Sequence, residues 1–303
     1  MKLIVKKDGE LLEYLYENLD MPKKRIKQYL THGAIYVNNN RVKQYNYKVV
    51  PGMNIMIDTE SKNKKTLPFE VLFEDEHIIV VNKPSGLLTI ATAKEKERTL
   101  YHIVREYLVS KDNHAKVFIV HRLDKDTSGI VVLAKDEKTK NQLQENWNEY
   151  VSLREYVAVV HGHLKESCGR VVQYLLETKT NLVYVSRGNE GKEAITNYKV
   201  IKESEKYSLV SVNIETGRKN QIRVAFQTLR HPIVGDKKYG EKTDKEARLY
   251  LHANRLKMYY PVLKKEILPK TVYPRFVPLF VSIHSNGLIH LFGFVKAVLP
   301  VLS

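Results

Sequence analysis

Charged side chains are concentrated between two apolar segments in the stretch VHRLDKDTSGIVVLAKD, residues 120–136. Arg122 and Asp124 lie two positions apart there, and each needs a partner or water because burying an isolated ion is costly. The loop therefore either stabilises the fold or forms part of a site. Metal-assisted hydrolysis by Asp124 would need further carboxylates or histidines at ligand spacing, and the surrounding sequence shows no such cluster. A site built on this loop is predicted to use no metal.

The composition favours a globular protein with a polyanionic partner. The chain has 303 residues, 43% of them hydrophobic, which suffices for one large domain and one small one. Its 50 Lys and Arg residues against 34 Asp and Glu give a formal charge of +16, which favours nucleic acid. The alternative is that many lysines only solvate the surface. The single cysteine, Cys168, excludes an internal disulfide framework and favours the cytoplasm.

Neither end of the chain predicts export or membrane insertion. The first residues, MKLIVKKDGELLEYL, carry charges every few positions and lack the apolar block of a signal peptide. Residues 281–303 are mostly apolar, but His284, Asn286 and Lys296 interrupt them, so no run reaches the length of a membrane span. We expect strand and turn in this C-terminal extension, whose role is unknown, and no membrane partner.

Residues 1–60 are predicted to form a small α+β domain. LDMPKKRIKQYL has the pattern of a helix with an apolar face at Ile26 and Leu30 and a stop at Gly33. The segments after it are typical of short strands around an Asn-rich turn and a Pro-Gly turn. The other face of the helix is basic and is suited to bind an RNA backbone through Lys23, Lys24 and Lys27.

This domain resembles the RNA-binding module of the ribosomal-protein S-four type. The helix is followed by HGAIYVNN and PGMNIMI, which correspond to that family's G-x-V-x-V-N pattern and closing G-x-x-I. The resemblance implies that residues 1–60 bind RNA. A generic α+β surface domain is the alternative.

A polar, charged segment over residues 61–67 is predicted to link this domain to a larger one, residues 68–280. Several apolar runs in the larger domain predict strands, and KTKNQLQENWNEY between two of them predicts an amphipathic helix. AITNYKVIKESEKYSLVSVNIET predicts two antiparallel strands with a turn near residues 204–206, followed by a helix from about Lys219. The fold class is therefore α+β, with a mixed, mainly antiparallel central sheet and flanking helices.

The larger domain resembles the pseudouridine synthases of the RluA type, which isomerise uridine in structured RNA. HRLDKDTSG is very close to the signature of that family. Further matches follow in the same order within residues 68–260: VVNKPSGLLT, EYVAVVHG, ETGRKNQIRV, RHPIVGDKKYG and RLYLHANRL. The resemblance implies the synthase fold, a uridine in RNA as substrate, and no cofactor or metal.

The reaction that the resemblance implies has a role for each of four residues. Uridine must be detached at its glycosidic nitrogen, turned and rejoined through C5, which requires a nucleophile, a proton acceptor and a dry pocket. By resemblance, Asp124 is the nucleophile, attacking either the sugar or the base, and Arg223 is the partner that keeps it charged. Tyr156 is implied to lie against the base and take part in proton removal. Because the uridine must leave its stack, Arg122 is implied to fill the gap.

The sequence departs from the family pattern in the arginine motif. Members usually read Thr-His where this chain has Lys219 and Asn220, and often His where it has Ala225. None of the three is the expected partner of Asp124. We therefore expect these departures to affect RNA placement rather than the chemistry.

These observations together predict an RNA pseudouridine synthase, a cytoplasmic monomer that acts on ribosomal RNA, with transfer RNA as the alternative substrate. A non-catalytic RNA-binding protein that keeps the fold is the rival hypothesis. Without the resemblance, Tyr156 would be assigned to the core and Arg223 to the helix surface. The presence of Asp124, Tyr156 and Arg223 together argues against the rival.

Overall fold

The computed structural model describes residues 1–303 except residues 32, 59–65, 189, 273 and 275–303. The predicted strand and turn of residues 281–303 and most of the predicted linker lie outside the described residues. The chain divides into two compact units: a smaller one, Met1–Pro68 with Tyr101–Val117, and a larger one, Phe69–Leu100 with the described residues from Phe118 onward. No helix among the described residues is long and apolar enough to cross a membrane.

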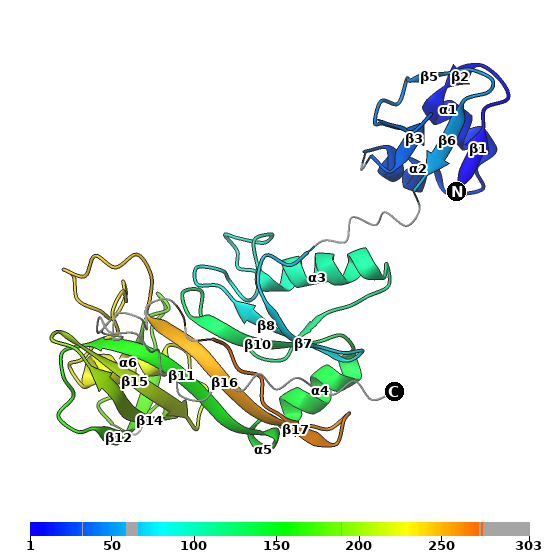
Figure 1. The fold of residues 1–303 in the computed structure, drawn as a ribbon. Coiled ribbons are helices and arrows are strands. Elements are labelled where there is room, and N and C mark those ends of the chain that lie inside the picture. The colour runs from blue at the N-terminus through cyan, green and yellow to red at the C-terminus, as the bar shows by residue number, and fades with distance from the viewer. Residues whose placement is uncertain (32, 59–65, 189, 273, 275–303) are drawn as a thin grey trace, which may run out of the picture. The chain divides into compact units, whose positions relative to one another are not determined.

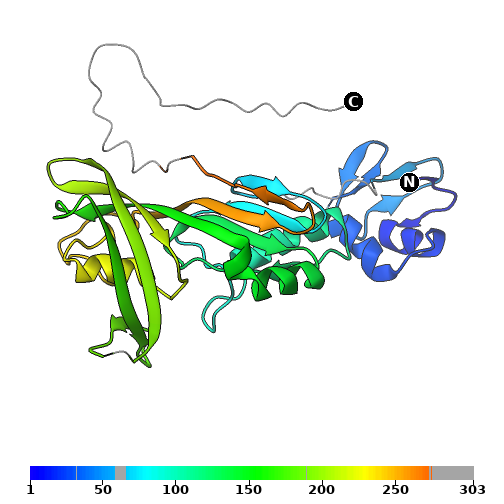
Figure 2. The ribbon, with the colours of Figure 1, turned by 90° about the horizontal axis from the view of Figure 1, so that it is seen from below.

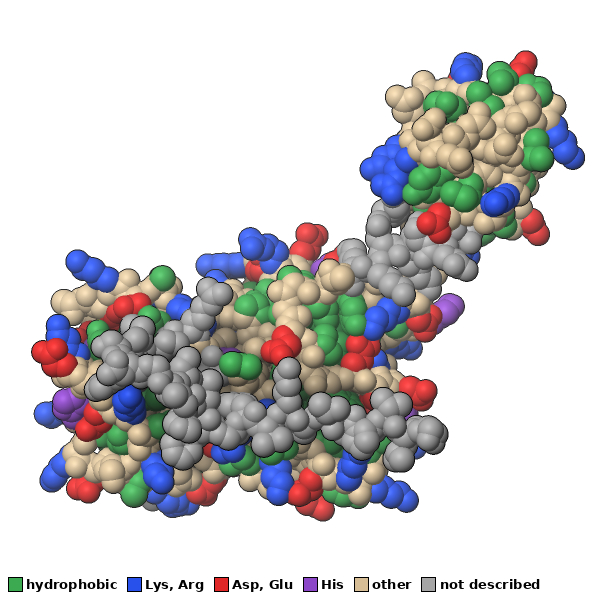
Figure 3. Space-filling model, in the orientation of Figure 1, with side chains coloured by type: hydrophobic (Ala, Val, Ile, Leu, Met, Phe, Trp, Pro, Cys, Tyr) green, Lys and Arg blue, Asp and Glu red, His purple; other side chains and the backbone are tan. Residues whose placement is uncertain are grey.

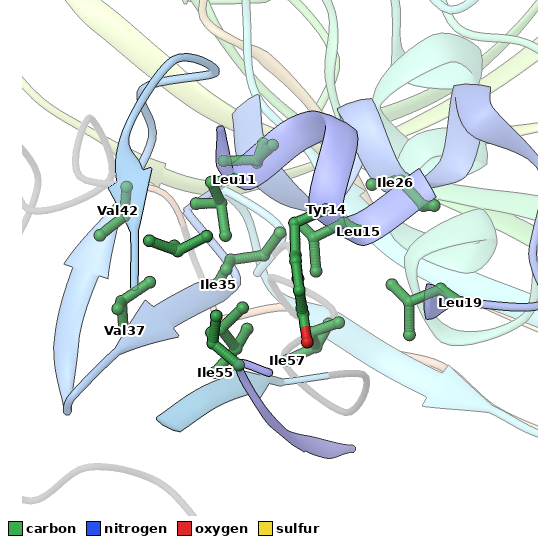
Figure 4. Close-up of a cluster of buried hydrophobic side chains, with 13 residues drawn as sticks. Leu11, Tyr14, Leu15, Leu19, Ile26, Ile35, Val37, Val42, Ile55 and Ile57 are labelled. Carbon is green, nitrogen blue, oxygen red and sulfur yellow. The ribbon is translucent and has the colours of Figure 1, made fainter. Parts of the chain in front are cut away.

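In the N-terminal part of the smaller unit, Met1–Pro68, two helices, α1 (Leu11–Asn18) and α2 (Lys23–Thr31), pack with short antiparallel strands. Its sheet has the order β1, β6, β3, β4, and β2 pairs separately with β5. Ile26 and Leu30, the predicted apolar face of the helix, are 1% and 0% exposed and belong to the core shown in Figure 4. The strands are β1 (Lys2–Ile4), β2 (Gly9–Glu10), β3 (Ile35–Val37), β4 (Asn40–Val42), β5 (Lys48–Val49) and β6 (Asn54–Ile57).

The turns of the smaller unit use residues that tolerate a positive φ. Gly33 has a φ of +68° just after α2, and its N–H donates to the carbonyl of Leu30, as expected of a helix stop. Asn38 and Asn39, with φ of +48° and +67°, form the two-residue turn between β3 and β4. The predicted Asn-rich turn is therefore confirmed.

The larger unit is built on one mixed sheet in the residues that the structure describes. The strand order is β13, β12, β14, β15, β11, β16, β10, β8, β7, with β9 added to β10 and β17 to β16 (Figure 1). Strands β10 and β16 run parallel, whereas the other pairs are antiparallel. The predicted α+β fold is therefore confirmed. The strands are β7 (Val71–Glu74), β8 (Ile78–Lys83), β9 (Phe118–Ile119), β10 (Ser128–Ala134), β11 (Val151–His161), β12 (Cys168–Glu177), β13 (Val183–Val185), β14 (Lys192–Glu203), β15 (Tyr207–Ile214), β16 (Leu251–Tyr260) and β17 (Lys265–Ile267).

Helices α4 and α6 lie on the same side of this sheet (Figure 2). The predicted helix over KTKNQLQENWNEY is two helices, because the chain leaves helical geometry at Asn146. Helix α4 begins after Asp136, whose carboxylate accepts a hydrogen bond from the N–H of Thr139 at 2.7 Å. The helices of the larger unit are α4 (Glu137–Glu145), α5 (Trp147–Tyr150) and α6 (Gln221–Thr228). Helix α3 (Leu100–Lys111), which the sequence patterns do not indicate, belongs to the smaller unit from Tyr101 onward.

Strand β16 joins the two halves of the sheet. It pairs with β10 on one side and with β11 on the other, so β7–β10 connect with β11–β15 through β16. In this register Ala253 is the partner of both Gly129 on β10 and Tyr156 on β11. The start of β10 and the middle of β11 are thereby held one strand apart, on either side of Ala253.

Gly129, the last residue of the Asp-Thr-Ser-Gly turn, makes this close pairing possible. Its φ is +116°, and a Cβ at this position would lie 2.2 Å from the carbonyl oxygen of Ala253. No side chain fits there. The neighbouring Ser128 adds a hydrogen bond of 2.8 Å between its hydroxyl and Nδ1 of His252, so the start of β10 is fixed to β16.

Candidate active site

A hollow in the larger unit, with an open volume of about 470 Å³, collects the residues that the sequence singles out. The loop between β9 and β10 contributes Arg122 and Asp124, β11 contributes Tyr156, and α6 contributes Arg223. The structure therefore brings the three predicted catalytic residues to one place. The remaining lining residues are Leu123, Thr127, Ile214, Gly217, Arg218, Asn220, Gln221, Ile222 and Leu251.

Lys83, the last residue of β8, is a buried cation beside the loop that carries Asp124. Its side chain is 0% exposed. Burial lowers the pKa of Lys83 to about 7, although the charges of Asp126 and Asp124 act in the opposite direction. An ammonium has three N–H donors, and these reach the backbone carbonyl oxygens of Pro84, Leu87 and Lys125 at 2.9, 2.7 and 3.1 Å.

Two hydroxyl groups hold the same loop on either side of Asp124. Thr89 donates to the carbonyl of Leu123 at 2.8 Å, and Ser85 donates to the carbonyl of Asp126 at 2.6 Å. These bonds fix the backbone on both sides of the carboxylate. The charged loop is therefore both anchored in the fold and exposed to the hollow.

Asp124 is partly buried, and its carboxylate has a neutral partner. Oδ2 accepts a hydrogen bond from Nδ2 of Asn220 at 2.5 Å. The expectation that Arg223 pairs with Asp124 is therefore wrong at the level of hydrogen bonds. Asn220, one of the three departures from the family pattern, therefore contacts Asp124 directly, although it is not an ion-pair partner.

Arg223 instead forms a buried two-point ion pair with Asp236. Its Nε and Nη2 donate to the two carboxylate oxygens at 2.8 and 2.6 Å, and the residues are 6% and 3% exposed. Burial alone would lower the pKa of Arg223, but the hydrogen bonds and charge of Asp236 raise it, with smaller contributions from Asp124 and Asp126. A fork-shaped cation buried here takes the acceptor that matches both of its N–H groups.

Tyr156 lines the hollow from β11, beside Asp124. Burial raises the pKa of Tyr156 to about 12, the positive charge of Arg154 opposes this, and the negative charge of Asp124 adds to it. The phenol therefore keeps its proton at neutral pH.

Two residues that line the hollow, Arg218 and Asn220, are not among the predicted site residues. Arg218 is exposed, and its Nε donates to the carbonyl of Glu193 at 2.8 Å. Asn220 has a φ of +53° immediately before α6. Both lie in the ETGRKNQIRV motif, so polar residues around the start of the predicted helix are the available signal.

The predicted RNA-binding lysines lie together on α2 of the smaller unit. Lys23, Lys24 and Lys27 are exposed, whereas Ile26 and Leu30 of the same helix are buried. The ammonium of Lys23 lies 5.0 Å from the centre of the Tyr16 ring. On the face of the larger unit seen in Figure 3, cationic side chains are spread among acidic ones rather than gathered in one block.

Comparison with known proteins identifies the family. Residues 77–228 match the family described as RNA pseudouridylate synthase, and residues 15–55 match the S4 domain. An uncharacterized RNA pseudouridine synthase of Mycoplasma pneumoniae is 32% identical over 268 residues, which are 84% of this chain and 85% of that protein. This chain therefore belongs to the RNA pseudouridylate synthase family. The predicted family, its RNA-binding module and its enzyme class, an isomerase, are confirmed.

Two further relatives agree with this assignment. The ribosomal large subunit pseudouridine synthase D of Salmonella typhimurium is 30% identical over 265 residues, 80% of each chain. The structure of human RNA pseudouridylate synthase domain containing 4 aligns with a TM-score of 0.58 and 26% identity, covering 71% of this chain and 92% of that chain. The large mixed sheet is thus the fold of this family.

Proposed function

We propose that this chain isomerises specific uridines in ribosomal RNA, with Asp124 as the catalytic nucleophile. The proposal is carried by one observation, the convergence of Asp124, Tyr156 and Arg223 on one hollow. The Salmonella relative, whose name refers to the large ribosomal subunit, supports the choice of RNA. We also propose that the protein is a cytoplasmic monomer with an RNA-binding domain over residues 1–60 and a catalytic domain over residues 68–280.

The proposed reaction conserves the atoms of uridine. The bond between N1 and C1′ breaks, C5 bonds to C1′, the proton of C5 leaves, and N1 gains a proton. The negative oxygen of Asp124 attacks either the sugar or the base, and Tyr156 takes part in removal of the C5 proton. Arg122, exposed at the hollow, fills the gap that the flipped uridine leaves in the RNA.

Release of tritium from RNA labelled at C5 of uridine tests this function. Each conversion removes the C5 hydrogen, so the expected result is release from ribosomal RNA of cells that lack the protein. Transfer RNA from the same cells is the comparison. Binding without release from either RNA would favour the non-catalytic rival.

Replacing Tyr156 with Phe is expected to slow turnover by about 10² to 10⁴-fold, the usual contribution of a proton-transfer group. RNA binding should change little because the ring remains. Only the ionised phenol can accept the C5 proton, and because burial raises the pKa of Tyr156 to about 12, the ionised fraction grows about tenfold per pH unit from roughly pH 6 to 9. The ratio of wild-type to variant rate should therefore rise with pH over that range. A ratio that stays constant would show that Tyr156 acts in its protonated form and does not accept the C5 proton.

Changing Lys23, Lys24 and Lys27 together to Gln is expected to weaken RNA binding and flatten its dependence on salt. Three lost phosphate contacts reduce the slope of log K against log salt by about 2, at about 0.7 per contact for single strands. The matched control removes three exposed lysines of the same unit outside α2, Lys2, Lys6 and Lys48. If the two variants had equal slopes of log K against log salt, α2 would not be the surface that contacts RNA.

A further inference from the structure

We propose that Asn220 is the positioning residue that orients Asp124 for reaction, an inference that rests on the proposed function. Asn220 is 7% exposed, and its amide donates to Oδ2 of Asp124. In the part of the chain that the structure describes, no second side chain donates a hydrogen bond to this carboxylate. One oxygen of Asp124 is thus held, and Oδ1 is left to act on the substrate.

The backbone keeps Asn220 in a conformation that few side chains adopt. Its φ and ψ are +53° and +18°, in the left-handed region that Asn tolerates better than most residues. The neighbouring Gln221 locks this segment from the other side. Its Oε1 accepts from the N–H of Arg218 at 3.0 Å and from the hydroxyl of Thr216 at 2.8 Å, and its Nε2 donates to the carbonyl of Ile195 at 2.9 Å.

Tyr239 sets the direction of the Asn220 amide. The hydroxyl of Tyr239 accepts the N–H of Val183 at 3.0 Å and lies 3.1 Å from Oδ1 of Asn220, to which it donates. A carboxylate can only accept hydrogen bonds, so the NH₂ end of the amide must face Asp124 and the oxygen must face Tyr239. The two contacts therefore enforce the same orientation.

Arg223 and Asp236 reach Asp124 through this chain of contacts. The guanidinium of Arg223 lies 5.1 Å from the centre of the Tyr239 ring. Oδ1 of Asp236 also accepts the backbone N–H of Tyr239 at 2.9 Å. The buried ion pair thus braces Tyr239, which directs Asn220, which holds Asp124.

Because residue 220 carries an amide, it can orient the carboxylate of Asp124 without adding a charge to the hollow. Three guanidinium groups, those of Arg122, Arg218 and Arg223, line the same hollow and supply positive potential. Asn220 adds a donor without a further charge and without a proton that could be transferred at neutral pH. Asp124 is therefore directed by a group that cannot itself be titrated there.

Two single variants and the double variant test this series of contacts from Tyr239 through Asn220 to Asp124. Asn220→Ala should lower kcat about 10 to 100-fold, the usual effect of one bond to a charged group, with KM changed less than about threefold because substrate contacts remain. Tyr239→Phe should lower kcat about 5-fold or more, because the amide can then turn. The double variant should be no slower than Asn220→Ala within about threefold, since both changes remove one linked arrangement. Losses that multiply would overturn the inference.

Asn220→Asp gives a readout that a merely structural residue would not produce. Two facing carboxylates repel at neutral pH, so kcat should fall at least as far as in Asn220→Ala. As the pH is lowered, the introduced carboxyl gains a proton and can donate as the amide did, so the rate relative to wild type should recover. Asn141→Asp, an exposed residue of α4, is the matched control and should behave as wild type. Absence of recovery in Asn220→Asp would contradict the role.

A measurement without RNA separates this inference from the proposed function. In wild type, the side-chain NH₂ signal of Asn220 in a nitrogen-15 spectrum should be protected from exchange, and it should shift in Asp124→Ala and in Tyr239→Phe. Wild type that releases no tritium from any RNA but keeps this protection would refute the proposed function alone. A freely exchanging NH₂ in wild type would overturn the inference, whatever the activity.

Discussion

Asp124→Asn is expected to lower turnover by at least about 10³-fold, while RNA binding stays within about threefold of wild type. Asn has the shape of Asp, and its amide oxygen can still accept the hydrogen bond from Asn220, so the site should keep its geometry. What is lost is the negative oxygen that attacks the substrate. Tritium release under single-turnover conditions measures the rate, and a filter-binding titration measures the affinity.

Asp126→Asn is the matched control for this prediction. It makes the same change two residues away, on an exposed side chain that does not line the hollow. Its rate should stay within about tenfold of wild type, because its carboxylate acts on the site only at a distance. Equal losses in the two variants would mean that the charge of the loop, and not the oxygen of Asp124, is what the reaction needs.

Arg223→Ala is expected to reduce both the free energy of unfolding and the rate of turnover. The main reason for the lost stability is that Asp236 would be left without its ion-pair partner. Asp236 is 3% exposed and would remain buried without its cation, which costs on the order of 3–5 kcal/mol. The brace on Tyr239 would be lost as well, so turnover should fall. Urea denaturation measures the free energy of unfolding, and tritium release measures the rate of the fraction that is folded.

Combining Arg223→Ala with Asp236→Asn distinguishes these two effects. The introduced amide still offers an oxygen to the N–H groups of Lys238 and Tyr239, which now donate to Asp236. The unpaired buried charge is gone, so much of the lost stability should return. The rate should not return, because the cation beside Tyr239 is still missing. A double variant as unstable as Arg223→Ala alone would show that packing of the Arg223 side chain, not its charge, stabilises the fold.

Local signals in the sequence were sufficient for much of the fold. The apolar face of α2, the Asn-rich turn and the strand pair β14–β15 each depend on residues a few positions apart, and each is found. The gathering of Asp124, Tyr156 and Arg223 in one hollow was expected from the family resemblance rather than from spacing. Hydrophobic periodicity and turn residues predict the elements of the fold, and the order of the family motifs predicts the site.

The partners within the site could not be predicted in the same way. Asn220 and Asp124 are 96 positions apart, and their contact exists because the sheet brings the end of one loop to the start of α6. The pairing of Arg223 with Asp236 likewise depends on burial, which decides between two available carboxylates only after the chain has folded. Helix α3 likewise has no signal in the sequence patterns that predict the other helices.

The position of β16 in the sheet has a consequence for the timing of assembly. Asp124 belongs to the half of the sheet that ends with β10, whereas Tyr156 and Arg223 belong to the half that begins with β11, and the strand between the halves spans Leu251–Tyr260. A chain emerging from the ribosome therefore completes both halves well before the strand that unites them appears. Products terminated before that strand would carry two unprotected sheet edges and no assembled reaction centre, so the cell would obtain aggregation-prone fragments rather than weakly active enzyme.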